Sequence, residues 1–380
     1  LRHPHARVVQ EGFSVVELID SDAVNAEMAR GISDPVVAAG VLKYGIGTYL
    51  GGGHRAMGRL MEAADSHPLG VAMVRAASAW RMTGLDSIAV PTLQRLAAEY
   101  AVSKPGSPHP ESAADALAWA TALEEEVVQL LEVVGADQVR CCDYVHDQLA
   151  GIPSPTATTY CDPHPRPIPW GAAAEAATTT GETLELSIRA HEAGHSGLAE
   201  SLLEQVLRSG GPNSGGAAYN LGVLLAERSD FDGARAAYQA GINAHQSDFD
   251  LMAAVNLGVI ERQLGDSDAA RAAYRYAIDA GHEEQTPMAL TNLGNLEAEL
   301  GNSEPARLAY EAAIRSGHPI HSAKASLGLG ELERKDRNVA AARAAYVRAT
   351  EAPDPHIVAE AASRWGDLER DAGDPQAATQ

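Results

Sequence analysis

One short motif in this sequence could do catalytic chemistry, His191-Glu192-Ala193-Gly194-His195. On a continuous helix, two histidines at this spacing share one face and can bind zinc, and the glutamate beside the first can activate a water molecule. The motif therefore admits a zinc-dependent hydrolase that uses His191, Glu192 and His195. The alternative is a solvated helix end, because the motif is short and the sequence places no third ligand.

A second group of residues could bind a metal without catalysis. Cys142 and His146 stand four positions apart beside Cys141, and Cys161-x-x-His164 follows. Their spacing matches no common zinc pattern, and free buried cysteines are the more frequent outcome in a helical module. No Gly-x-Ser-x-Gly nucleophile motif is present. We therefore expect no metal, no other cofactor and no enzymatic activity.

Three asparagines, one in each of three similar segments, form the third candidate group: Asn220, Asn256 and Asn292. A side-chain amide both donates and accepts hydrogen bonds, which suits contact with an extended peptide main chain. The alternative is that each amide bonds to a neighbouring backbone or to water.

The asparagines belong to an internal repeat of 36 residues, marked by Gly222, Gly258, Gly294, Gly330 and Gly366. An alanine follows twelve positions after each glycine, and a tyrosine follows four positions later in the first four units. This pattern resembles the tetratricopeptide repeat. The resemblance implies a mainly α fold, a right-handed superhelix of antiparallel helix pairs. Small residues would lie where the helices cross, with the tyrosine filling the space beside them.

Turn residues separate the two helices of each unit, at Ser229-Asp230, Gly265-Asp266 and Gly301-Asn302. The same frame places Gly194-His195 at such a turn, which favours a helix end over a zinc site. The array covers residues 180–380, with units near 180–214, 215–250, 251–286, 287–322, 323–358 and 359–380. The last unit is incomplete and the chain begins with Leu1, so we expect a fragment, with the number of further repeats open.

In tetratricopeptide proteins that bind peptides, the asparagine position lies on the concave face and hydrogen-bonds the ligand main chain. By this resemblance, Asn220, Asn256 and Asn292 form a ladder in the groove. Neighbouring groove positions lie one and five residues after the glycines: Val223, Glu227, Val259, Gln263, Asn295 and Glu299. Lysine and arginine are scarce there, which disfavours a clamp for a terminal carboxylate. We expect a protein or peptide ligand that is apolar, basic or bound through its main chain.

The first 180 residues have a different organisation. Periodicity predicts helices over 69–82, 90–100 and 111–123, followed by short strands or further helix over 126–134 and 138–145. This order would suit a small helical, winged-helix-like module over residues 67–150. Six prolines between 151 and 169 indicate a linker, which we extend to residue 179. Residues 1–66 form a separate helical segment.

Several short stretches resemble the region that follows the nucleotide-binding core of actinobacterial STAND-type ATPases: 67–70, 74–77, 80–81, 116–120 and 143–145. Residues 45–60 resemble the end of that core. The resemblance implies a bacterial signalling protein whose repeat array senses a partner and regulates a nucleotide switch. No G-x-x-x-x-G-K-[ST] motif occurs here, so the ATPase core would lie upstream of Leu1.

The amino-acid composition bears on the partner, on membrane insertion and on the cellular compartment. The formal net charge is −22 and only four lysines occur, which argues against a nucleic-acid partner. A peptide-responsive DNA-binding regulator with a winged helix is the alternative. The sequence contains no run of about 18 apolar residues, so it predicts no membrane span. Three cysteines make no disulfide framework, so we expect a cytoplasmic protein.

Overall fold

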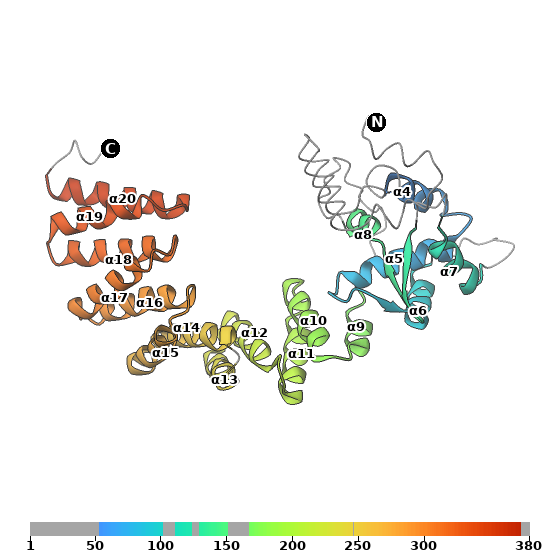
Figure 1. Ribbon diagram of the computed structural model, residues 1–380, viewed down its shortest axis with the longest axis horizontal. Helices are drawn as coiled ribbons and strands as arrows, with labels where there is room; N and C mark the ends of the chain where they lie inside the picture. The colour runs from blue at the N-terminus through green and yellow to red at the C-terminus, as the bar shows by residue number, and fades with distance from the viewer. Residues whose placement is uncertain (1–52, 102–110, 124–128, 151–166, 246, 374–380) are drawn as a thin grey trace, which may run out of the picture. The chain divides into compact units, whose positions relative to one another are not determined.

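The computed structural model describes residues 53–101, 111–123, 129–150, 167–245 and 247–373 (Figure 1). The chain divides into two compact units, Leu1–His195 and Ser196–Gln380, which are described separately below. The predicted segment 1–66 is described from residue 53 onward, so residues 45–52 of the stretch that resembles the end of a nucleotide-binding core lie outside the described ranges.

The first unit contains helices and one small sheet. Its elements are α4 (Gly53–Glu62), α5 (Pro68–Arg81), β1 (Ile88–Ala89), α6 (Val90–Tyr100), α7 (Ala113–Thr121), β2 (Leu131–Gly135), β3 (Gln138–Cys141), α8 (Asp143–Ala150), α9 (Trp170–Ala176) and α10 (Thr180–Glu192). The strands form an antiparallel sheet in the order β1-β3-β2. Three helices followed by a β-hairpin match the order expected of a winged-helix-like module. Both predicted alternatives for the segment that follows occur, because residues 131–135 and 138–141 are strands and helix α8 begins at Asp143.

Helix α5 is the centre of this unit, and Trp80, Met73 and Val74 are almost completely buried. The Glu111 carboxylate accepts hydrogen bonds from the backbone N–H groups of Leu69 and Gly70, at 2.8 and 3.2 Å. A carboxylate at this end of a helix satisfies free N–H groups and complements the helix dipole. Glu111 therefore fixes the start of α5.

Paired helices make up the second unit (Figure 1). They are α11 (Ser196–Ser209), α12 (Ser214–Glu227), α13 (Phe231–Asn243), α14 (Ser247–Leu264), α15 (Ser267–Asp279), α16 (Gln285–Glu299), α17 (Ser303–Arg315), α18 (His321–Lys335), α19 (Val339–Ala349) and α20 (Pro355–Asp371). The four repeats that begin with α12, α14, α16 and α18 place the periodic glycine on the first helix and the periodic alanine and tyrosine on the second, as predicted.

The periodic glycines lie against the periodic tyrosine rings. A Cβ atom added to the glycine would come within 2.4–2.6 Å of the ring in each of four pairs: Gly222 with Tyr238, Gly258 with Tyr274, Gly294 with Tyr310, and Gly330 with Tyr346. Such distances are shorter than any ordinary contact, so only glycine fits. The alanines of the same frame, including Ala270 and Ala306, have no exposed surface. The predicted role of these residues in helix crossing is confirmed.

The turns between paired helices also follow the prediction. Gly265 and Gly301 have φ values of +82° and +80°, and Ser229 occupies the same conformation at +62°. The backbone N–H of Asp266 donates to the Glu261 carbonyl at 2.9 Å, closing the helix end. The Asp266 carboxylate then accepts from the N–H of Ala269 at 3.0 Å and caps helix α15.

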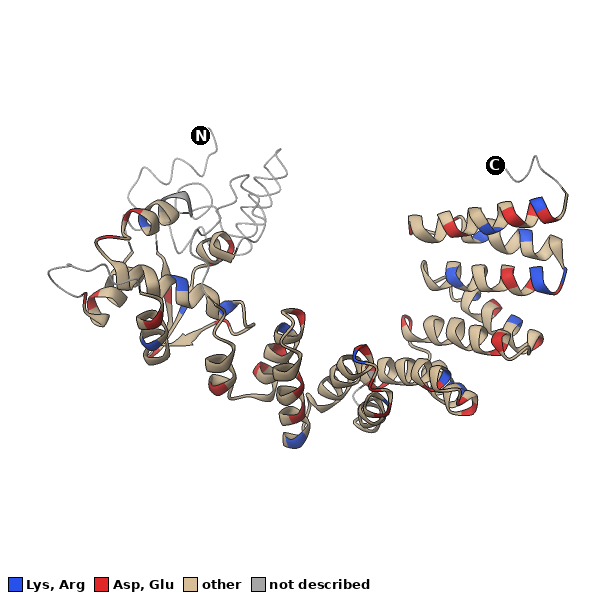
Figure 2. Cartoon of the chain, turned by 180° about the vertical axis from the view of Figure 1, so that it is seen from behind, with Lys and Arg blue, Asp and Glu red and all other residues tan. Residues whose placement is uncertain are grey.

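A ladder of ion pairs joins successive repeats, which the sequence analysis did not predict. Each arginine follows the periodic alanine, and each glutamate lies three residues after the next periodic glycine: Arg235–Glu261, Arg271–Glu297, Arg307–Glu333 and Arg343–Glu369. The Nε–Oε distances are 2.7, 2.7 and 2.6 Å in the first three pairs. The glutamates are at most 5% exposed. Figure 2 marks the positions of the basic and acidic residues along these helices in blue and red.

Two observations bear on the predicted boundaries, which remain predictions. Helix α9 lies inside the segment assigned to the linker, most of which is outside the described residues. The division between the two units falls after His195, between the helices of the first predicted repeat. Within the described ranges, no helix is both long and apolar enough to cross a bilayer.

Candidate functional site

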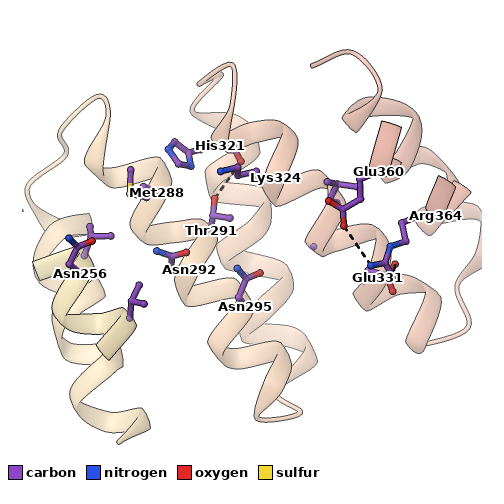
Figure 3. A pocket seen from close by; sticks show the side chains of 14 residues that line it. Asn256, Met288, Thr291, Asn292, Asn295, His321, Lys324, Glu331, Glu360 and Arg364 are labelled. Atoms are coloured by element: carbon purple, nitrogen blue, oxygen red, sulfur yellow. Dashed lines mark hydrogen bonds and ion pairs between the residues drawn. The ribbon is translucent and has the colours of Figure 1, made fainter. Parts of the chain in front are cut away.

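A concave cavity of about 640 Å³ runs across the first helices of successive repeats, α14, α16, α18 and α20. Its lining residues occupy equivalent positions of the 36-residue frame: Val255, Asn256, Val259, Met288, Thr291, Asn292, Asn295, His321, Lys324, Leu327, Gly328, Glu331, Glu360 and Arg364. Figure 3 shows the side chains of Asn256, Asn292 and Asn295 facing this cavity from neighbouring helices. We call this surface the groove.

The groove brings together four of the nine residues that the sequence singled out: Asn256, Asn292, Val259 and Asn295. The other five lie outside its lining: Asn220, Val223, Glu227, Gln263 and Glu299. Glu299 forms an ion pair with Arg262 at 3.5 Å, and Gln263 is exposed near the end of α14. The positions five residues after the glycine therefore do not contribute to this cavity.

The three predicted ladder asparagines differ in their hydrogen bonds. The Asn220 amide donates to the carbonyl of Gly216 in its own helix at 2.9 Å. The Asn256 amide makes a long contact of 3.4 Å to the hydroxyl of Tyr238. Among the described residues, the half-buried Asn292 side chain has no hydrogen-bond partner. Asn292 is therefore the ladder amide whose hydrogen-bonding capacity is open to a ligand.

The hydroxyls of the periodic tyrosines make different contacts from one repeat to the next. The Tyr310 hydroxyl donates to Asn295 at 2.8 Å, and the Tyr346 hydroxyl donates to Glu331 at 2.9 Å. In the two preceding repeats, valine stands at the position of Asn295 and Glu331, one residue after the periodic glycine. There the Tyr238 hydroxyl contacts Asn256, whereas the Tyr274 hydroxyl is buried and has no partner in the described part of the chain.

The ladder ends where a tyrosine occupies the space of the next asparagine. A Cβ atom at Gly328 would lie 2.6 Å from the Tyr310 ring and 2.8 Å from its hydroxyl oxygen. No longer side chain fits at this position. The loss of asparagine at Gly328, visible in the sequence, therefore has a steric cause.

Charged side chains gather at the end of the groove nearest α20. Arg364 forms ion pairs with Glu331 at 3.3 Å and with Glu360 at 3.6 Å. The exposed Lys324 makes no ion pair within the described residues. Burial and neighbouring positive charge on His318 and Lys324 lower the pKa of His321. The sequence analysis missed Lys324 and Glu360, although both stand six residues before a periodic glycine.

The geometry of the His191–His195 segment does not match a zinc-binding helix. Helix α10 ends at Glu192, and Gly194 turns the chain with a φ of +83°. The N–H of His195 donates to the carbonyl of Ala190 at 2.7 Å, which closes the helix end. The His195 ring lies beside Trp170, with 5.3 Å between ring centroids. The second histidine thus lies beyond the helix, as the repeat frame predicted.

The cysteine and histidine cluster is only partly within the described ranges, because Cys161 and His164 lie outside them. Cys141 is buried, and burial raises its thiol pKa. Burial also raises the pKa of Cys142 to about 12. His146 contacts the Ser78 hydroxyl at 3.1 Å, and burial lowers its pKa to about 4. At neutral pH these groups are uncharged and packed in the first unit.

Comparison with known proteins agrees with the repeat pattern. The family model described as tetratricopeptide repeat matches residues 184–249, 230–285, 255–319 and 291–356. No curated protein matches the chain.

Among solved structures, PilF of Pseudomonas aeruginosa is similar, with 17% identity over 53% of this chain and 87% of that one, and a TM-score of 0.44. A tetratricopeptide repeat protein of Parabacteroides merdae shares 22% identity over 53% and 76% of the two chains, with a TM-score of 0.42. BtubC of P. vanneervenii shares 18% identity over 53% of this chain and 88% of that one, with a TM-score of 0.43. From the family match, residues 184–356 of this chain are similar to tetratricopeptide repeats, and in the second unit these residues form successive antiparallel helix pairs.

Proposed function

We propose that this protein is a non-enzymatic binding protein whose groove holds an extended peptide segment of a protein partner. The observation that carries the proposal is the side chain of Asn292. It faces the cavity between Asn256 and Asn295 and has no hydrogen-bond partner among the described residues. An amide in this position can both donate to and accept from a ligand main chain.

The charges of the groove favour recognition through the main chain. Arg364 is already held by two carboxylates, so Lys324 is the groove cation without an ion pair within the described residues. A single exposed lysine is a weak basis for gripping a terminal carboxylate. Val259, Met288 and Leu327 add apolar surface between the polar groups. This mixture suits a peptide whose side chains alternate between apolar contact and solvent.

Selection from a random dodecapeptide library displayed in vitro would test the proposal on the full chain. We expect wild-type protein to enrich peptides that N292A does not retain. The matched control is N243A, which removes an exposed asparagine from α13, outside the groove. Peptides retained equally by wild type and N292A would contradict the proposal. Because the Asn292 side chain makes no hydrogen bond within the described residues, N292A should remain folded, and circular dichroism would check this.

We further propose that peptide binding regulates a STAND-type nucleotide switch in the intact protein. The support is the sequence resemblance of residues 67–150, together with the observed order of helices and strands in that segment. A Walker motif in the coding sequence upstream of Leu1 would support this role, and its absence there would count against it. The decisive measurement is ATP hydrolysis by the protein with that upstream sequence, with and without a groove-binding peptide.

Binding to DNA has less support as a function of the winged-helix-like module. Helix α7, the third of its helices, contains no lysine or arginine. Arg140 on β3 is engaged by Glu132 and Asp86. An electrostatic DNA interface needs unpaired basic side chains on the docking element. A salt-dependent mobility shift of a DNA duplex by the purified chain would reverse this assessment.

A further inference from the structure

A second cavity, of about 550 Å³, lies between the start of α14 and the end of α15. Its lining combines acidic and aromatic side chains and contains neither lysine nor arginine: Asp248, Asp250, Leu251, Tyr276, Asp279, Ala280 and His282. The side chain of Tyr276 is partly exposed, at 38%. An acidic pocket beside an accessible aromatic ring complements an organic cation.

The carboxylate of Asp250 gives this pocket an unmet hydrogen-bonding requirement. Asp250 is only 7% exposed. Its Oδ2 accepts a hydrogen bond from the Tyr276 hydroxyl at 3.3 Å, whereas its Oδ1 is buried and has no partner among the residues that the structure describes. A buried carboxylate oxygen without a donor destabilises the folded state unless a ligand supplies that donor.

The repeat frame shows that aspartate is unusual at this position. The equivalent residues one and two repeats later are Thr286 and Ser322. Their hydroxyls donate to the carbonyls of Ala277 and Ala313, both at 3.2 Å. An ionised carboxylate has no proton to donate, so Asp250 cannot make the corresponding bond to the carbonyl of Gly241. Where the two later repeats have a hydrogen-bonded hydroxyl, this repeat has a carboxylate whose Oδ1 has no partner within the described residues.

The donor set favours an organic cation over a metal ion. Among the described residues, no group of three histidine, cysteine or acidic side chains is placed to hold a metal. A guanidinium is planar and weakly hydrated, so it can donate to a carboxylate oxygen while its face rests on an aromatic ring. We propose that this pocket binds an arginine side chain of a protein partner, with the Asp250 carboxylate as acceptor and Tyr276 as the stacking surface.

Ligand-observed NMR on the full chain can test this assignment with small probes. The probes are N-acetyl-arginine amide, the uncharged N-acetyl-citrulline amide and N-acetyl-lysine amide. We expect the arginine probe to bind wild type about tenfold more tightly than D250T and than the two other probes. N292A should bind the arginine probe like wild type, which separates this pocket from the groove.

The D250T variant also carries an independent stability readout. Threonine restores the hydroxyl found in the next repeat, so D250T should unfold at a higher temperature than wild type. A lower unfolding temperature would overturn the argument that Asp250 is held at a cost to stability. Equal binding of the arginine probe to D250T, or equal binding of citrulline or lysine probes to wild type, would overturn the proposed guanidinium site.

Discussion

The repeats contain two sets of positions that behave differently. At the packing positions, glycine, tyrosine, arginine and glutamate recur and make nearly the same contacts each time. At the position two residues before the periodic glycine, Asn220, Asn256, Asn292, Gly328 and Arg364 occupy equivalent places but make different contacts. The constant set holds one repeat against the next, and under the proposed function the variable set contacts the ligand. Mutations in the two sets should therefore have separable effects.

The largest effect on stability should come from the glycine–tyrosine contacts. Gly294→Ala places a methyl group 2.6 Å from the buried ring of Tyr310. We expect it to lower the free energy of unfolding by about 3 kcal/mol, because the packed core must shift to admit it. The matched control is Gly197→Ala, since nothing lies within 4 Å of a Cβ atom there. Urea denaturation should show no loss of stability for the control.

Breaking one ion pair of the ladder should have the next largest effect. Glu297→Ala leaves Arg271 without its buried partner and should cost about 2 kcal/mol in urea denaturation. Arg315→Ala removes an exposed pair with Glu311 at 3.6 Å and should change stability by less than about 0.5 kcal/mol. Equal losses in both variants would show that burial of the ladder glutamates does not matter.

The tyrosine hydroxyls permit a smaller and more selective comparison. Tyr310→Phe removes a hydrogen bond to Asn295 and should cost about 1 kcal/mol. Tyr274→Phe removes a buried hydroxyl that has no partner within the described ranges, so it should be neutral or slightly stabilising. Thermal denaturation of the two variants gives the comparison. A clear loss in Tyr274→Phe would reveal a bond for that hydroxyl in solution.

Acid should weaken the ion pair between Arg271 and Glu297 in a narrow range of pH. The hydrogen bond from Arg271 lowers the pKa of Glu297 below its usual value of 4.5. The stabilisation is therefore fully present above pH 4.5 and is lost as the pH falls through the lowered pKa of the folded state. In stability measurements from pH 6 to pH 2.5, Glu297→Gln should show a shallower acid decline than wild type. Parallel curves would contradict this assignment.

Much of the fold could be predicted from the sequence because its packing residues have a fixed period. The frame placed the helix crossings, the turns at Gly265 and Gly301, and the helix end before His195. It did not reveal the ladder of ion pairs, although an arginine and a glutamate recur at the positions of Arg271 and Glu297 in each frame. Residues 26 positions apart on different helices meet only through the superhelical stacking of repeats.

The candidate site was less predictable for a related reason. The frame identifies equivalent positions, but it does not show which side chains already have partners inside the protein. Asn220 bonds to its own helix, Asn256 contacts a tyrosine hydroxyl, and Asn292 has no such bond among the described residues. These differences appear only in the three-dimensional contacts, because the three asparagines stand at the same position of the frame.

The central claim is that the variable groove positions bind a peptide while the constant positions hold the array together. The most direct measurement is fluorescence anisotropy with one labelled peptide selected on wild-type protein. The account predicts that N292A weakens its binding at least about tenfold, with unchanged thermal stability, and that N243A binds like wild type. Unchanged affinity of N292A, or a loss of affinity matched by a loss of stability, would contradict the claim.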